Sequence, residues 1–180
     1  MEAAALRIIV RKLLSREEPG LLVPAGPWDL DLQKQIQGLG PANPSQRCLQ
    51  AALHLWNDDL WGCHDLVQKE EDEHGALLHA ILHRREPDAG NAKYWFRRVP
   101  DGPLYPQLLE AAKELAREGP DLGRLGRDLA AMKTWDALRM VDWCEGAVAG
   151  DDLRFLRALQ ALELQGLTYS WLTRAGFPHP

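Results

Sequence analysis

The segment HAILHRREPDAGNAKYWFRRV, from His79 to Val99, predicts a pair of helices joined by a short turn. Apolar residues recur at helical spacing on both sides of Pro87-Asp-Ala-Gly90, so we expect one helix over residues 74–86 and another over 91–99. The same segment carries two histidines four residues apart, five cationic side chains and two carboxylates. A helical pair that only buried one face would not need that density of ionisable groups. The segment is therefore also where we expect the chemistry of the protein.

The rest of the chain continues the helical pattern. Leucine and alanine dominate, valine and isoleucine are scarce, and no stretch of four residues alternates in the manner of a strand. Ser45 is the expected N-cap of one helix and Asp58 or Asp59 that of the next, while a glycine-rich link is expected near residues 119–126. The other expected helices cover residues 2–17, 29–37, 45–57, 105–117, 134–148 and 151–174.

A chain of 180 residues with 46% apolar content fits a single soluble domain. We expect an all-α bundle of eight to ten helices, with N-terminal helices and connectors over 1–44, the central hairpins over 45–99 and C-terminal helices over 104–180. Residues 54–64 can be aligned with residues 83–93, since each segment predicts a helix, an acidic turn and the start of a second helix. This echo resembles the hairpins of tetratricopeptide-like repeats, although its period of about 29 is short of the usual 34.

Charge and cysteine content limit the classes of function. The net charge of −5 argues against nucleic-acid binding and against a basic membrane-surface protein. No stretch is apolar enough to cross a membrane, and the N-terminus does not read as a secretory signal. Cys48, Cys63 and Cys144 are odd in number and lack CxxC spacing, which favours reduced thiols and a cytoplasmic protein.

The histidines suggest a metal site. On a helix, His79, His83 and Glu86 fall within a stripe of about 60°, and two histidines at i and i+4 can bind one ion. His64, on the preceding helix, is the expected third ligand, with Glu86 or Asp58 as an oxygen donor. Such ligands suit zinc, iron, manganese or nickel. Two other interpretations remain open: a buried structural network of hydrogen bonds, and acid–base chemistry by histidine without a metal.

The cations suggest an anionic ligand. They give residues 79–99 a local charge of +3 in an acidic chain, and paired arginines bind carboxylates or phosphates well. The alternative is that these cations pair with the acidic run at residues 70–73 and with Glu86 and Asp88. Trp95 and Phe96 are expected in the core. The expected ligand-binding residues are Arg84, Arg85, Lys93, Tyr94, Arg97 and Arg98.

Two segments, Trp56 to Gln68 and His79 to Arg98, resemble an uncharacterised bacterial and fungal family. Its hallmark is a block of the form HRREGDxxNAKYWFRRVG. The resemblance to the family is close over about 45 residues, which include both segments. The chain departs from the block at Pro87 and Pro100, where the family has glycine, so we expect the turns there to differ from those of the family. The resemblance implies a shared helical fold and a shared role for the block. It implies no activity.

Together these features predict a helical protein with a polar pocket formed by the three histidines and Glu86. The pocket would bind a metal ion, an anionic small molecule, or both. If the protein is an enzyme, Glu86 or a histidine such as His79 would be the general acid–base group. The alternative is a non-enzymatic, tetratricopeptide-like interaction module in which the block only holds two helices together.

Overall fold

The computed structural model describes residues 1–68, 72–99, 102, 104–147 and 149–179, and of residues 73 and 74 it describes the backbone only. Within these ranges the chain forms ten α-helices and no strand, which confirms the all-α prediction. The helices are α1 (Ala3–Leu14), α2 (Leu30–Gln37), α3 (Pro44–Trp56), α4 (Leu60–Val67), α5 (Glu73–Arg85), α6 (Ala89–Phe96), α7 (Tyr105–Glu118), α8 (Gly123–Ala131), α9 (Ala137–Gly146) and α10 (Gly150–Arg174).

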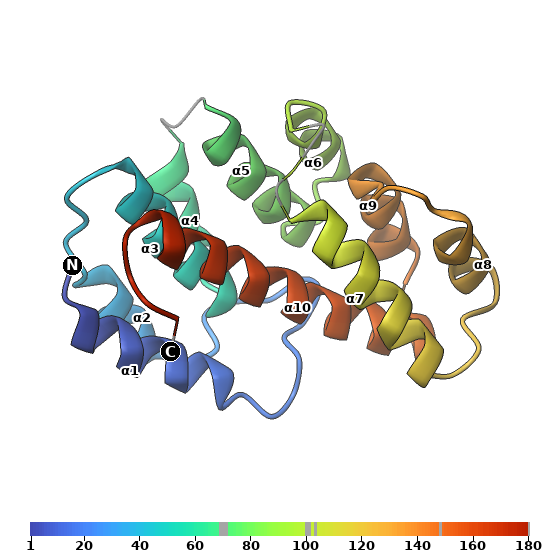
Figure 1. Cartoon of the computed structure of the whole chain (residues 1–180), viewed down its shortest axis with the longest axis horizontal. Helices are drawn as coiled ribbons and strands as arrows, with labels where there is room; N and C mark the ends of the chain where they lie inside the picture. The colour runs from blue at the N-terminus through green and yellow to red at the C-terminus, as the bar shows by residue number, and fades with distance from the viewer. Residues whose placement is uncertain (69–71, 100–101, 103, 148, 180) are drawn as a thin grey trace.

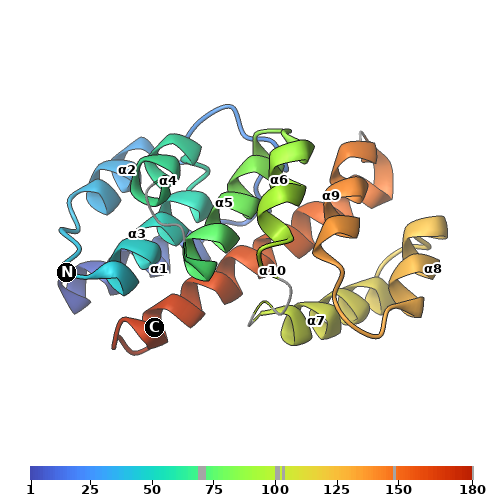
Figure 2. The same cartoon turned by 90° about the horizontal axis from the view of Figure 1, so that it is seen from above.

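Two helices organise the packing. α3 is buried at every position from Cys48 to Trp56 and packs against α2, α4, α5 and α10. α10 runs through the middle of the molecule, with α1–α4 on the side of its C-terminal half and α7–α9 on the side of its N-terminal half (Figure 1). The view from above shows the same order along α10 (Figure 2). α10 therefore joins the two halves of the bundle.

Two local expectations were wrong. The glycine-rich link contains α8, because Leu122, Leu125 and Leu129 are spaced to bury one face, and this burial outweighs the poor helix propensity of glycine. The N-cap of α3 is Asn43, not Ser45. The Asn43 side chain accepts the backbone N–H of Gln46 at 3.0 Å, and Pro44 takes the first helical position, where its missing N–H costs nothing.

The turns of the two central hairpins share a geometry. The backbone N–H of Asp59 donates to the carbonyl of His54 at 2.9 Å, and that of Asp88 donates to the carbonyl of His83 at 2.9 Å. Each aspartate then caps the helix that follows, Asp59 for α4 and Asp88 for α6. The echo of 29 residues thus corresponds to two similar turns. A tetratricopeptide-like repeat is not confirmed by this likeness.

The C-terminal end of α5 is held by two fully buried guanidinium groups that point to different neighbours. Arg85 donates to the Asp58 carboxylate and to the Leu55 carbonyl in the α3–α4 turn, and to the Leu21 carbonyl at 3.2 Å. Arg16 contacts the other Asp58 oxygen at 2.7 Å. Asp58 has φ = 61°, a left-handed conformation that aspartate and asparagine tolerate better than most residues.

The second guanidinium, that of Arg84, contacts α10. It donates to both carboxylate oxygens of Glu163 and to the side-chain oxygen of Gln160 at 3.3 Å. Burial opposes the charge of Arg84, but the Glu163 carboxylate outweighs burial and raises the pKa of this guanidinium above its ordinary value. Through these two arginines α5 is fixed to α3–α4 on one side and to α10 on the other.

We expect Asp58→Asn to destabilise the protein by about 3–5 kcal/mol, because it leaves the Arg85 charge buried without a compensating carboxylate. Asparagine keeps the size of the side chain and tolerates the left-handed backbone, so the loss reports the charge. Asp31→Asn is the control, since Asp31 pairs with Lys34 at an exposed site and should cost less than about 1 kcal/mol. Urea unfolding measures both; equal losses would contradict the role of Asp58.

Candidate functional site

Three imidazoles gather where α4 packs against α5. The ring centroids of His64 and His79 lie 5.9 Å apart, those of His64 and His83 6.3 Å, and those of His79 and His83 6.0 Å. α5 supplies His79 and His83 from successive turns of one face, and α4 supplies His64 from the facing helix. The structure thus brings His64, His79 and His83 together, as the sequence predicted.

The hydrogen bonds of two of these rings fix which nitrogen carries a proton. His79 Nδ1 lies 3.2 Å from the Gly75 carbonyl, and His83 Nδ1 lies 3.0 Å from a Glu86 carboxylate oxygen. Both partners accept hydrogen bonds, so each Nδ1 carries a proton. In a neutral imidazole the lone pair is then on Nε2. Histidine ligands of metal ions in proteins commonly have this arrangement, with the second nitrogen bonded to a carbonyl or carboxylate.

His79 is held in its neutral form. Its side chain is buried and its ring stacks on Trp95, with centroids 4.4 Å apart and planes inclined by 11°. Burial lowers the pKa of His79 to about 4; the Gly75 carbonyl opposes this shift and the neighbouring histidines add to it. At neutral pH the ring therefore offers a lone pair and no positive charge.

Trp95 of α6 borders the histidines, and Tyr94 and Arg98 lie next to Trp95. Trp95, half-buried, lies between the cluster and the Arg98 guanidinium, which is 5.2 Å from its ring centroid. Arg98 also donates to the Tyr94 hydroxyl at 3.2 Å, and Tyr94 is 51% exposed. Trp95 therefore does not belong to the inner core as expected, whereas Phe96 does. Arg97, at the end of the same helix, is exposed.

The three rings do not form a closed coordination group in this structure. Across the described part of the chain, no three or more histidine, cysteine, aspartate or glutamate side chains are arranged to hold a metal ion. Three imidazoles bound to one zinc ion, with Zn–N distances of about 2.0–2.1 Å, have ring centres roughly 5 Å apart. The observed separations of 5.9–6.3 Å exceed this by about an ångström. Binding an ion would require the side chains to turn inward.

Several predicted site residues lie elsewhere. Arg84 and Arg85 are buried and engaged with Glu163 and Asp58, so they do not border the histidines as anion-binding groups. Asp58 is likewise not an oxygen donor to the cluster. Lys93 pairs with Asp142 and Glu145 of α9, away from α4. Helical periodicity placed these residues on faces of their helices but could not tell which neighbouring helix each face meets.

A buried pair that the sequence did not single out lies in the hairpin of α3 and α4. His54 Nδ1 contacts the Asp59 carboxylate at 2.7 Å, and both side chains are 2% exposed. Burial alone would raise the pKa of the Asp59 carboxyl, but hydrogen bonds from His54, the Gly62 N–H and Gln33 outweigh it and lower the pKa. A Cβ on Gly62 would lie 2.4 Å from Asp59, so glycine is required there. One feature of the sequence could have pointed to this pair: His54 aligns with His83 when residues 54–64 are compared with residues 83–93.

Comparisons with protein-family models, with curated proteins and with solved structures find no match to this chain. The family resemblance of the His79–Arg98 block therefore stays a prediction. Among the described helices, none combines the length and the apolar character needed to span a lipid bilayer.

The lowered pKa of Asp59 predicts a specific acid sensitivity. A carboxyl whose pKa is lower in the folded than in the unfolded state stabilises the fold above its unfolded value, 3.8, and loses that contribution as the pH falls through the folded value. We expect the stability of the wild-type protein to fall more steeply below about pH 4 than that of Asp59→Asn. Urea unfolding at a series of pH values measures the slopes. Parallel slopes would contradict the prediction, and Asp31→Asn serves as the exposed control.

Proposed function

We propose that this protein binds a divalent transition-metal ion through His64, His79 and His83. The observation that carries the proposal is the gathering of three imidazoles from two helices within 6.3 Å of one another. Two of them have Nδ1 occupied by a protein acceptor, which leaves Nε2 for an ion. Three neutral nitrogen ligands without a thiolate suit zinc, nickel, iron or manganese.

The surroundings of the cluster favour ligand binding over simple packing. The Glu86 carboxylate accepts a hydrogen bond from His83 Nδ1 at 3.0 Å, which leaves the His83 Nε2 lone pair available to an ion. Such a partner orients the ring and strengthens it as a ligand. Burial keeps His79 deprotonated well below neutral pH, so a proton would not compete with the ion there.

Three protein ligands leave one position of a tetrahedral ion for water or a substrate atom, as in catalytic zinc sites. Among the predicted anion-binding residues, Arg98 lies over the Trp95 ring, 5.2 Å from its centroid, so its positive charge would act across the indole ring on an anion bound to the metal. We therefore infer an anionic small molecule as the second ligand, with Glu86 or His79 positioned for proton transfer if the protein is catalytic. The cysteine pattern favours a cytoplasmic location for this chemistry.

The structural-network interpretation applies to a different part of the block. The guanidinium groups of Arg84 and Arg85 are buried and donate to the carboxylates of Glu163 and Asp58, and this burial favours a structural role for both. The block therefore divides between the histidine face of α5, assigned to ligand binding, and its arginine positions, assigned to fold stability.

Metal titration of chelator-stripped protein tests the proposal. We expect calorimetry with Zn²⁺ and with Ni²⁺ to show about one ion per chain, and His79→Ala or His83→Ala to weaken binding at least 100-fold. Glu86→Gln should weaken it about 10-fold while leaving the stoichiometry unchanged, because it removes only the partner of His83. Circular dichroism checks that each variant remains folded.

His179→Ala is the matched control, because His179 is exposed near the C-terminus and lies outside the cluster. It should bind the ion as tightly as the wild-type protein. A wild-type protein that binds neither ion, or His79→Ala and His179→Ala variants of equal affinity, would overturn the proposal and leave a structural network of histidines.

A further inference from the structure

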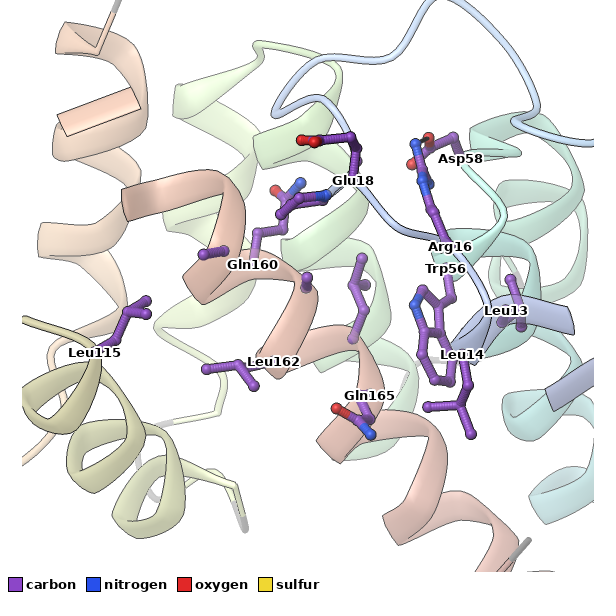
Figure 3. Close-up of a pocket in the computed structure, with 15 residues that line it drawn as sticks. Leu13, Leu14, Arg16, Glu18, Trp56, Asp58, Leu115, Gln160, Leu162 and Gln165 are labelled. Atoms are coloured by element: carbon purple, nitrogen blue, oxygen red, sulfur yellow. Dashed lines mark ion pairs between the residues drawn. The ribbon is translucent and has the colours of Figure 1, made fainter. Parts of the chain in front are cut away.

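A hollow of about 280 Å³ lies against α10, between the end of α1 and α7, and Asp58 and Glu18 bring two carboxylates to one end of it (Figure 3). We do not expect an ion to bind there. Asp58 is already engaged by the guanidinium groups of Arg16, at 2.7 Å, and of Arg85. Glu18 is exposed, and the leucine side chains of the other walls supply no ligand. A transition-metal ion is therefore expected at the histidine cluster, where the three rings limit which ion fits.

Within the cluster, the ring of His79 is firmly held. Its Nδ1–H donates to the Gly75 carbonyl at 3.2 Å, and the ring stacks on Trp95 with centroids 4.4 Å apart. Trp95 is itself fixed, because Tyr94 meets it edge-on at 5.3 Å and the Arg98 guanidinium lies 5.2 Å from its centroid. A large displacement of His79 would therefore break both its hydrogen bond and its aromatic stack.

The ring of His64 has more freedom to move. It stands nearly perpendicular to the other two, with its plane inclined by 85° to that of His79 and by 71° to that of His83. Among the residues that the structure describes, none forms a hydrogen bond with the His64 ring, whereas His79 and His83 each have an acceptor. The helix that carries His64, α4, is only eight residues long. We therefore expect His64 to make the larger movement when an ion binds.

The spacing of the three rings favours one coordination geometry. With metal–nitrogen bonds of about 2.1 Å, three imidazoles at tetrahedral angles have ring centres about 5.3 Å apart, and three at right angles have them about 4.6 Å apart. The observed separations are 5.9–6.3 Å. A tetrahedral ion thus requires the rings to approach by up to about 1 Å, and an ion with ligands at right angles by about 1.5 Å.

We propose that this site selects zinc over ions whose ligands lie at right angles, such as Ni²⁺ and Mn²⁺, and that Trp95 is the positioning residue that enforces the selection. This inference rests on the metal binding proposed above. Turning of His64 and His83 brings the rings close enough for a tetrahedral ion. The further approach that right-angled ligands need would have to come from His79, and it would break the stack on Trp95. Selectivity among these ions in proteins depends on such differences in geometry more than on the affinity of single ligands.

Calorimetry of the chelator-stripped protein with Zn²⁺ and with Ni²⁺ tests the selection. We expect Zn²⁺ to bind the wild-type protein at least about 10-fold more tightly than Ni²⁺. Trp95→Ala frees His79 and should reduce this ratio to about threefold or less, whereas Trp95→Phe keeps a stacking ring and should retain the ratio. Trp61→Ala is the matched control, because it removes a tryptophan that is 84% exposed on α4. Circular dichroism checks that each variant is folded.

Cobalt separates this inference from the proposed function. Four-coordinate Co²⁺ absorbs visible light more strongly than six-coordinate Co²⁺, because its ligands lack a centre of symmetry. At saturating Co²⁺ we expect strong bands in the wild-type protein, weaker bands in Trp95→Ala and unchanged bands in Glu18→Gln, whose side chain lies in the hollow beside α10. Weak bands in the wild-type protein, or a ratio of Zn²⁺ to Ni²⁺ affinity that Trp95→Ala leaves unchanged, would overturn the selection but not the histidine site. Failure of all three ions to bind would overturn both.

Discussion

The burial of two consecutive guanidinium groups at the end of α5 is the constraint on which the rest of the structure depends. An arginine cannot lose its charge in a protein, so each buried guanidinium needs a carboxylate and further acceptors around it. Arg85 takes Asp58 of the α3–α4 turn and the Leu55 carbonyl at the end of α3, and Arg84 takes Glu163 and Gln160 of α10. Because these acceptors belong to separate elements, satisfying both charges fixes the position of α5 against the two helices that organise the bundle. Breaking either pair would leave a charge in the core, which costs far more than breaking an ion pair at the surface.

This constraint also decides the orientation of α5, and with it the location of the histidines. Once Arg84 and Arg85 face the interior, the stripe that holds His79 and His83 must face α4 and α6. There the two rings meet His64, and the His79 ring stacks on Trp95. The buried arginines and the histidines that we propose as metal ligands therefore lie side by side on a single helix, and this would explain why one short segment contains so many ionisable groups. The Asp58 carboxylate also connects the segment that follows α1 to this arrangement, because Arg16 and Arg85 both contact it.

Much of the site could be predicted from the sequence, and the reason is local. Residues four apart on a helix share a face, so the pairing of His79 with His83 follows from spacing, and the short α4–α5 connection makes His64 a plausible neighbour. The partners of the cationic side chains could not be predicted in this way, because Arg84, Arg85 and Lys93 pair with residues on α10, in the α3–α4 turn and on α9, respectively. Partners separated by as many as 79 residues leave no periodic signal. The His54–Asp59 pair was missed although its members are only five residues apart, since a turn of unknown geometry separates them.

The sequence by itself determined that this protein is all-helical, where most of the helices begin and end, and which residues share a helical face. These properties depend on backbone propensity and on apolar spacing, both of which act within a few turns of a helix. Only the tertiary structure decided which faces meet, and so which charges are buried in pairs and which side chains surround an accessible space. α8 shows the same limit for secondary structure, because burial of its leucines turns a glycine-rich segment into a helix. A residue's neighbours across the bundle depend on how all ten described helices pack, and no local pattern contains that information.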